Sequence, residues 1–288
     1  MKKNKYILES IMKYVFLVSA LISVLSIILI CVFIFQGGVP FMLDYGIGKF
    51  VFGTVWRPGD KVPQFGVLPM IWGSVYTTIL AVIGGIPIGI LTASYLAKSA
   101  NKKLYKFLKP LLNLMAGIPS IVYGFFALQV IVPLIKRLVG GQGLSILAAS
   151  SLLAIMILPT IISLSEAAIR AVPKAYYEGS LALGASHERS MYKVIIPAAK
   201  SGIFASVVLG IGRAIGETMA VVLVAGGQPW LTADVTKGIR TLTMNVVLEM
   251  AYAHGAHREA LIASAVLLFI FILLINFALY IFKKRSSL

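Results

Sequence analysis

The fold of this chain is decided by a polar stretch between two apolar ones, which reads YYEGSLALG over residues 176–184 and closes with VIIP at residues 194–197. Glu178 stands six positions before Gly184, and nine further residues separate Gly184 from the apolar ending. A membrane protein needs an amphipathic helix in a loop only where a partner outside the bilayer binds it. The stretch therefore indicates a membrane protein with a partner.

Residues 173–197 are predicted to form a loop that contains one short amphipathic helix. Pro173 suits the first helical position, where its missing N–H costs nothing, and Gly184 suits the stop. Glu178 lies in the first turn, where a carboxylate complements the helix dipole. Four residues at helical spacing share one face, and they are Tyr177, Ser180, Leu181 and Gly184. We predict that this face and Glu178 dock on a partner; a helix lying in the lipid interface is the alternative.

The composition is that of an integral membrane protein. Hydrophobic residues make up 59% of the chain, charged residues 12%, and the mean hydropathy is +0.94. The net charge of +16 does not indicate nucleic-acid binding, because the basic residues lie at the ends of apolar stretches and form no stripe interleaved with aromatics. We therefore expect membrane lipid, and no nucleic acid, around this chain.

Six apolar stretches are long enough to cross a bilayer, since about 20 helical residues span its hydrocarbon core of roughly 30 Å. They cover residues 14–35, 70–97, 110–135, 144–165, 202–226 and 260–282. The first is too long for a cleaved signal peptide, so we interpret it as a retained anchor. The prediction is an all-α membrane protein with a short N-terminus, residues 1–13, and one six-span domain, residues 14–288.

The basic residues predict the orientation. The N-terminus, the second loop, the fourth loop and the C-terminal tail hold four, five, five and three Lys and Arg, whereas the three opposite loops together hold eight. By the positive-inside rule both termini are cytoplasmic. The loop 173–197 then faces the cytoplasm as well.

Two opposite charges lie inside the fifth span. Arg213 and Glu217 are four residues apart, hence on one face of a continuous helix. An unpaired charge at mid-bilayer costs about 2.5–3.5 kcal/mol, so some compensation is required. Two compatible interpretations follow. The two residues form an internal salt bridge, or they line a hydrophilic path in which Arg213 meets an anion and Glu217 holds the arginine in place, or both. Glycines at 210, 212 and 216 allow close helix approach or leave room for a solute.

Helix-breaking residues in the third span form a second candidate for the path. Gly117, Pro119 and Ser120 either expose polar backbone there or simply pack a kink. Glu166 and Arg170 are predicted to form an interfacial pair at the end of the fourth span.

Histidines and carboxylates in an outward loop have a metal-like spacing, and they are Glu249, His254, His257 and Glu259. Such spacing in a single sequence is usually coincidence, so we predict no metal site.

Several motifs together resemble a known family. The loop resembles the EAA loop of ABC importer permeases, E-A-A-x3-G-x9-I-x-L-P, with Gly179 and Ser180 in place of the two alanines. GRAIGETMA at 212–220 and AGIPSIVYGF at 116–125 resemble the phosphate transporter permeases of that family. Near the start, WRP at 56–58, FGVLP at 65–69 and Gly73-Ser74 resemble the subunit usually called C.

The resemblance implies a type I importer permease fold and a role in phosphate uptake by alternating access. The loop would be the coupling helix that seats in a cytoplasmic ATPase dimer, and Arg213 and Glu217 would act in phosphate passage. A homologous second permease subunit and an extracytoplasmic phosphate-binding protein would complete the transporter in the bacterial cytoplasmic membrane.

The chain has no GxxxxGK[ST] motif, so it is expected to be no enzyme and to bind no cofactor, ATP being hydrolysed by the partner. Other readings stay open: a permease for molybdate, sulfate or phosphonate, an ion-coupled secondary transporter in which Glu217 carries a proton, or a membrane signalling scaffold.

Overall fold

The computed structural model describes residues 2–286, and side chains for Glu9, residues 11–278, Tyr280 and Ile281. In the described residues the helices are joined by loops, and the strands are those of one small hairpin, β1 (Trp56–Arg57) and β2 (Gln64–Phe65). Helix α1 (Lys2–Tyr45) is longer than the expected span 14–35, and the short α2 (Ile47–Phe52) follows it.

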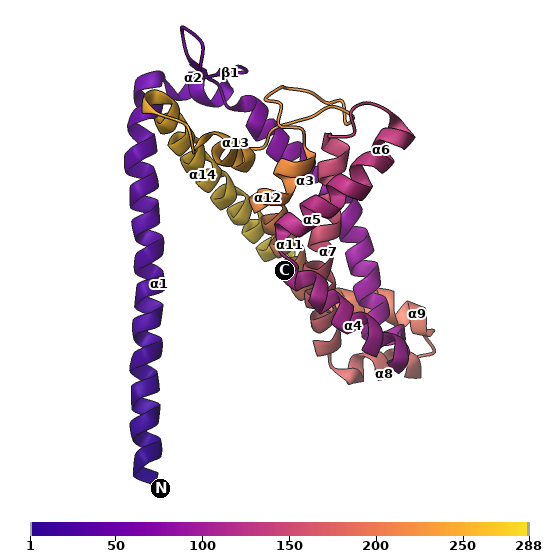
Figure 1. Ribbon diagram of the computed structural model, residues 1–288. Helices are drawn as coiled ribbons and strands as arrows, with labels where there is room; N and C mark the ends of the chain where they lie inside the picture. The colour runs from indigo at the N-terminus through magenta and orange to yellow at the C-terminus, as the bar shows by residue number, and fades with distance from the viewer. Residues whose placement is uncertain (1, 287–288) are drawn as a thin grey trace.

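Helix α1 stands apart from the body of the molecule and meets it at one end (Figure 1). There it packs on α14 (Gly255–Ser286), so closely that a Cβ on Gly38 would lie 2.7 Å from Val266 Cγ2. The side chains from Ile11 to Ile30 are exposed on every side. Only lipid or a further chain can cover so much apolar surface.

The centre of the body consists of α3 (Leu68–Ser94), α7 (Ile146–Ala171) and α11 (Lys200–Gly216). Gly85 and Gly89 of α3 let that helix approach α7, since a Cβ at either would lie 2.7 Å from Ile157 or Ile161. Small residues at such contacts are typical of helices that pack inside a membrane. The π-helical turn η1 (Tyr95–Ser99) continues α3.

The third apolar stretch is not the continuous helix expected over residues 110–135. Helix α4 (Lys102–Gly117) ends before Ile118 and Pro119, and a new helix starts at Ser120. This second helix consists of α5 (Ser120–Phe126), the π-helical turn η2 (Ala127–Ile131) and α6 (Val132–Val139). Pro119 lacks an N–H and disfavours helical backbone at Ile118, so the chain breaks where a kink was predicted.

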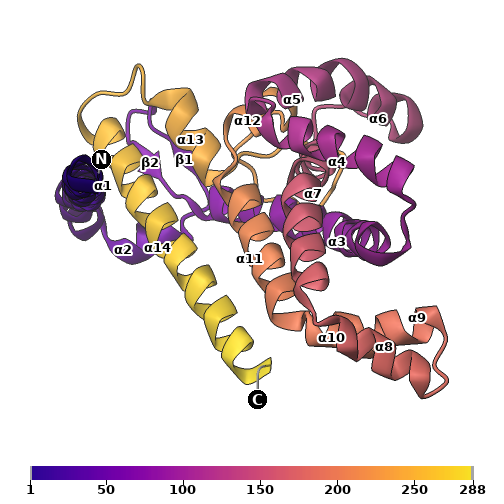
Figure 2. The ribbon, with the colours of Figure 1, turned by 90° about the horizontal axis from the view of Figure 1, so that it is seen from below.

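The segment 173–197 forms a chain of short helices that projects from the ends of α7 and α11 (Figure 2). They are α8 (Lys174–Ala182), α9 (His187–Ser190), the π-helical turn η3 (Met191–Ile195) and α10 (Ile196–Ala198). Residues 187–198 and helix α11 meet at an angle of 71°. The segment therefore turns away from the direction of the spans.

The fifth apolar stretch is also interrupted. Helix α11 stops at Gly216, and α12 (Met219–Val224) begins three residues later, so the continuous helix expected over 202–226 does not form. After α12 the chain runs through a loop to α13 (Leu242–Glu249) and then to α14.

Five helical stretches among the described residues are long and apolar enough to cross a membrane, and a sixth is added if the bent pair 187–198 and 200–216 counts as one span. The five cover residues 11–45, 68–99, 120–139, 146–171 and 255–278. The predicted all-α membrane fold is confirmed. The division at residue 13 and the orientation stay predictions.

Candidate functional site

Glu217 lies at the break of the fifth span and not on the helix that holds Arg213. Its backbone is extended, with φ −68° and ψ 131°. Its Oε1 accepts hydrogen bonds from the N–H groups of Thr218 (3.1 Å) and Ala220 (3.2 Å). The carboxylate thus caps α12, where negative charge also complements the helix dipole. The expectation that Arg213 and Glu217 share one face of a continuous helix is wrong.

Arg213 lies in the last turn of α11, and no carboxylate among the described side chains pairs with it. Its Nη1 donates to Thr160 Oγ1 of α7 at 3.3 Å, and its side chain is half-buried. The salt bridges among the described side chains include neither Arg213 nor Glu217. The internal salt bridge is therefore not formed, and Glu217 does not hold Arg213 in place as the second interpretation predicted.

The glycines around Arg213 have two different surroundings. A Cβ on Gly210 would lie 2.9 Å from Ile161 Cγ1, so Gly210 serves the close packing of α11 on α7. A Cβ on Gly212 or Gly216 would meet no heavy atom within 4 Å. Gly212 and Gly216 are therefore not packed against other described parts of this chain.

The break at Ile118 has the same geometry as the break at Glu217. Ile118 has φ −67° and ψ 129°, and in both breaks the N–H bonds to the carbonyl three residues earlier at 3.4 Å. A Cβ on Gly124 would lie 2.8 Å from Ala220 Cα, so the half-helices α5 and α12 that follow the two breaks pack on each other. Gly117, Pro119 and Ser120 therefore belong to the same region as Glu217.

Tyr123, which the sequence did not single out, closes the first break. Its hydroxyl donates to the carbonyl of Met115 in α4 at 2.8 Å, and it lies close enough to Arg213 for an electrostatic interaction. A tyrosine four residues after the Pro119 signal could have been noticed, because a broken helix needs side-chain donors for its free carbonyls.

Helix α8 matches the predicted amphipathic helix to within one residue at each end. Pro173 is the residue before the helix instead of its first residue, and Glu178 is the fifth residue of α8, so the prediction that it lies in the first turn is wrong. Gly184 has φ +82°, and the N–H groups of Gly184 and Ala185 bond to the carbonyls of Leu181 (2.9 Å) and Ser180 (3.1 Å). This is the Schellman arrangement, which favours glycine at that position. The predicted stop at Gly184 is confirmed.

Some residues of the predicted docking face of α8 are exposed, and others form hydrogen bonds within the segment 173–197. Glu178, Leu181 and Gly184 are exposed, whereas the Tyr177 hydroxyl bonds to His187 Nδ1 at 2.7 Å and Ser180 Oγ donates to the Tyr177 carbonyl at 2.7 Å. Leu183, which was not predicted as part of this face, is 91% exposed and adjoins Leu181. The docking role stays a prediction.

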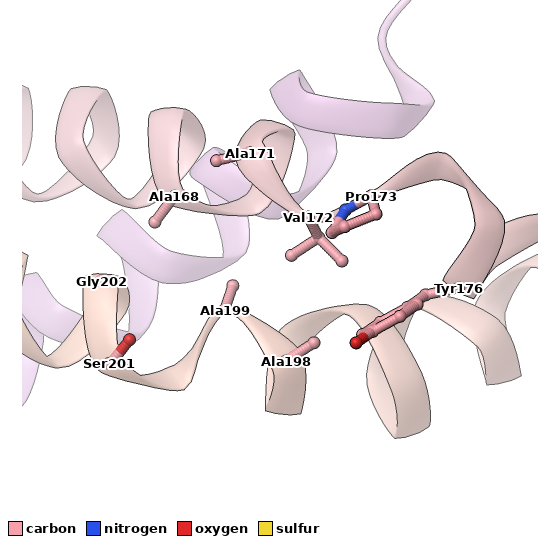
Figure 3. Close-up of a pocket in the computed structure, with 9 residues that line it drawn as sticks. All are labelled: Ala168, Ala171, Val172, Pro173, Tyr176, Ala198, Ala199, Ser201 and Gly202. Atoms are coloured by element: carbon pink, nitrogen blue, oxygen red, sulfur yellow. The ribbon is translucent and has the colours of Figure 1, made fainter. Parts of the chain in front are cut away.

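A cleft of about 400 Å³ opens at the base of α8 (Figure 3). The end of α7 forms one wall, the start of α11 forms the other, and Tyr176 lies toward one end. Small side chains line most of it, and the lining residues are Ala168, Ala171, Val172, Pro173, Tyr176, Ala198, Ala199, Ser201 and Gly202.

Glu166 and Arg170 form the predicted pair at the end of α7, and the Glu166 carboxylate is in addition buried and bound by Lys109. The Glu166 side chain is 2% exposed; Oε1 accepts from Arg170 Nε at 2.7 Å and Oε2 from Lys109 Nζ at 2.6 Å. Arg170 also donates from Nη2 to the carbonyl of Leu96 at 2.8 Å and stacks over the Tyr105 ring at 4.6 Å. One carboxylate thus forms a junction of α4, α7 and η1.

Glu249 is a second such junction, at the opposite end of the molecule. It accepts hydrogen bonds from Trp56 Nε1 (2.9 Å), from Arg240 Nη1 and from His257 Nε2 (2.8 Å). Burial alone would raise the pKa of Glu249, but these three hydrogen bonds outweigh it and hold the pKa below its ordinary value. Within the described residues no three His, Cys, Asp or Glu side chains are close enough to hold a metal ion.

Known proteins resemble this chain over most of its length. Residues 85–287 match the family described as "Binding-protein-dependent transport system inner membrane component". The probable ABC transporter permease protein YqgH of Bacillus subtilis is 38% identical over 267 residues, which cover 90% of this chain and 86% of that protein. The phosphate transport system permease protein PstC of Mesorhizobium japonicum is 28% identical over 267 residues, covering 85% and 81%. An inward-facing structure of the MetNI methionine ABC transporter superposes with a TM-score of 0.60 at 22% identity, covering 76% of this chain and 95% of that chain.

Proposed function

Since this chain belongs to the family of binding-protein-dependent transport system inner membrane components, it is a permease subunit of an ABC importer, and we propose that its cargo is inorganic phosphate. The family confirms the predicted class and the multi-pass inner-membrane location. It also removes the ion-coupled secondary transporter as an alternative. The relatives named as phosphate transport permeases, such as the one from Mesorhizobium japonicum, support the choice of cargo.

The observation that carries the proposal is the unpaired Arg213. A charged side chain inside the membrane needs a counter-charge, and no described carboxylate supplies one here. The open space beside Gly212 and Gly216 leaves room for an anion. A guanidinium can donate two parallel hydrogen bonds to a tetrahedral oxyanion, which suits phosphate.

In this proposal Glu217 acts on the path without touching the anion. By capping α12 with its carboxylate it maintains the break of the fifth span, and the break separates its negative charge from Arg213. The break at Gly117, Pro119 and Ser120 lies between α4 and α5 of this chain. Because α5 packs on α12, this break would line the same passage. The arrangement is typical of transporters, whose sites are built from discontinuous helices.

We further propose that the α8 end of the molecule faces the cytoplasm, as the positive-inside rule predicts. Glu178, Leu181 and Gly184 would then seat on a separate ATPase dimer, which hydrolyses the ATP. A homologous second permease subunit would supply the other half of the pathway. ATP-driven closure of the ATPase would move α8 and rock the spans, so that the path opens outward and then inward past Arg213.

The solute-binding protein would dock at the opposite end, on the loop between α12 and α13. Trp72 Nε1 and the Tyr76 hydroxyl donate to the successive carbonyls of Thr232 (2.7 Å) and Ala233 (2.9 Å), which anchors the loop on α3. Next to these anchors Trp230 is 56% exposed. A fixed loop with an exposed tryptophan is typical of a protein-binding surface.

Uptake of labelled phosphate tests the proposal, with this chain reconstituted in vesicles together with its ATPase, its second permease and its binding protein. We expect Arg213→Gln to reduce uptake by about 30-fold or more, because the anion loses its charged partner in a desolvated path. Arg213→Lys should retain part of the activity, and Arg137→Gln, at an exposed position on α6, should retain all of it.

Unchanged uptake by Arg213→Gln would show that this side chain does not meet the cargo. A guanidinium does not by itself distinguish phosphate from sulfate, molybdate or a phosphonate, so each is added as a competitor. Transport of one of these in preference to phosphate would replace the proposed cargo.

A further inference from the structure

We propose that His187 is a positioning residue that transmits movement of α8 to the ends of α3 and α4. The inference rests on the proposed function, in which α8 is the helix that the ATPase moves. His187 lies on α9, yet its ring connects two other elements. Nδ1 lies 2.7 Å from the Tyr177 hydroxyl of α8, and Nε2 lies 3.1 Å from Ser99 Oγ of η1.

The imidazole suits this position because both of its nitrogens have a hydroxyl partner. A neutral histidine has one donor and one acceptor, and a hydroxyl can play either role, so both bonds form with either tautomer. The rings of His187 and Tyr177 also meet edge to face, with centroids 5.8 Å apart. Lys98 Nζ of η1 lies 5.6 Å from the centre of the Tyr177 ring and adds a cation–π contact. Tyr177, His187 and Ser99, which we call the strut, thus hold α8 to the end of α3.

The strut continues into the Glu166 junction. In η1, three residues before Ser99, the Leu96 carbonyl accepts from Arg170, whose Nε binds Glu166. The second oxygen of Glu166 binds Lys109 of α4 at 2.6 Å. Removing one partner from a buried ion pair is costly, so η1, α7 and α4 are held together. Movement that reaches η1 therefore reaches the helix that leads into the break at Ile118.

The base of α8 lies beside a cleft. Its connection to α7 has one long hydrogen bond, from Val172 N to the Ile169 carbonyl at 3.4 Å, and one of ordinary length, from Tyr176 N to the Pro173 carbonyl at 3.1 Å. The cleft of about 400 Å³ lies directly against it (Figure 3). Since protein interiors are otherwise close-packed, the cleft provides space into which the base of α8 can move. With space beside its base and the strut bonded to η1, displacement of α8 is passed to η1.

The experiment compares ATP hydrolysis with phosphate uptake in the reconstituted complex. We expect His187→Ala to co-purify with the ATPase and hydrolyse ATP, but to move about 3- to 10-fold less phosphate per ATP. His187→Gln, whose amide reaches the position of Nε2, should recover part of the loss. Because both residues act through one strut, the double variant Tyr177→Phe with His187→Ala should be no worse than the stronger single variant. His254→Ala is the matched control, because His254 is an exposed histidine between α13 and α14, away from the strut.

Four results contradict the inference or its premise. If His187→Ala moves as much phosphate per ATP as the unaltered protein, or if the two substitutions add, the strut transmits nothing and the proposed function stands. If His187→Ala loses the ATPase, the residue belongs to the docking surface instead. If the unaltered chain binds no ATPase, the proposed function itself is wrong. Should His187→Ala not fold, Ser99→Ala removes the other end of the strut at an exposed position and is held to the same expectation.

Discussion

Two pairs of glutamate and arginine stand four residues apart in this chain, and their arrangements are opposite. Glu166 and Arg170 lie on the unbroken helix α7 and form a salt bridge of 2.7 Å. Arg213 and Glu217 lie on either side of the point where α11 ends, and each binds other partners. The same spacing thus gives a salt bridge in one region and, in the other, an arginine without a described carboxylate partner.

The difference follows from the helix ends around each pair. Arg170 lies in the last turn of α7, where a cation complements the helix dipole, and its glutamate precedes it, which is the favourable order. Glu217 precedes α12, where a carboxylate is favourable too, but toward a different helix from that of Arg213. Each charge is stabilised locally, and only the continuity of the helix decides whether the two meet.

Among the variants that test this comparison, removal of Glu166 should change the stability most. We expect Glu166→Ala to lower the free energy of unfolding by about 3 kcal/mol, the low end for a broken buried ion pair. The low end applies because Lys109 and Arg170 keep 27% and 45% of their side-chain exposure and can reach water. Chemical denaturation in detergent measures it. A loss below about 1 kcal/mol would reduce the junction to an ordinary surface pair.

Removal of Glu217 should cost less, since it caps a short helix and pairs with no cation. We expect Glu217→Ala to lower the free energy of unfolding by about 1 kcal/mol, as for the loss of an N-terminal cap. Glu217→Gln keeps an oxygen for the Thr218 and Ala220 N–H groups and should retain most of the stability. The same denaturation assay compares the two. A cost as large as that of Glu166→Ala would mean that Glu217 has a charged partner after all.

A third carboxylate, Glu249, extends the comparison to the pH dependence of stability. Its pKa in the folded chain is below the ordinary value, so its stabilising contribution is complete above a pH of about 4.3 and is lost as the pH falls through the folded pKa. We expect Glu249→Gln to be less stable than the unaltered protein at neutral pH, and the gap to shrink in acid. Thermal denaturation in detergent across this range tests it. A gap that widens in acid would contradict the assignment.

Much of this molecule is predictable from local sequence. The membrane class, the approximate spans and the start and stop of α8 follow from apolar length, Pro173 and Gly184. The break at Glu217 does not, because GRAIGETMA contains no proline, and the free N–H groups are satisfied by the carboxylate of Glu217 itself.

The partners of the other candidate residues are distant in sequence. Lys109 is 57 residues from Glu166, and Ser99 is 88 residues from His187. A periodic pattern reports which residues share a helix face, but it carries no information on which helices meet. The sequence therefore predicts the pair of Glu166 with Arg170, four residues away, but not the bond to Lys109 or the burial of the carboxylate.

Helix α1 has a further consequence for how the protein sits in its membrane. Its 44 residues rise about 66 Å, more than twice the hydrocarbon thickness of roughly 30 Å, so even a steep tilt leaves several turns outside the lipid tails. It packs on α14 at Gly37 and Gly38, close to one of its ends. The helix therefore extends beyond the lipid tails, and its contact with α14 ties the end that leads to the β-hairpin to the body of the molecule.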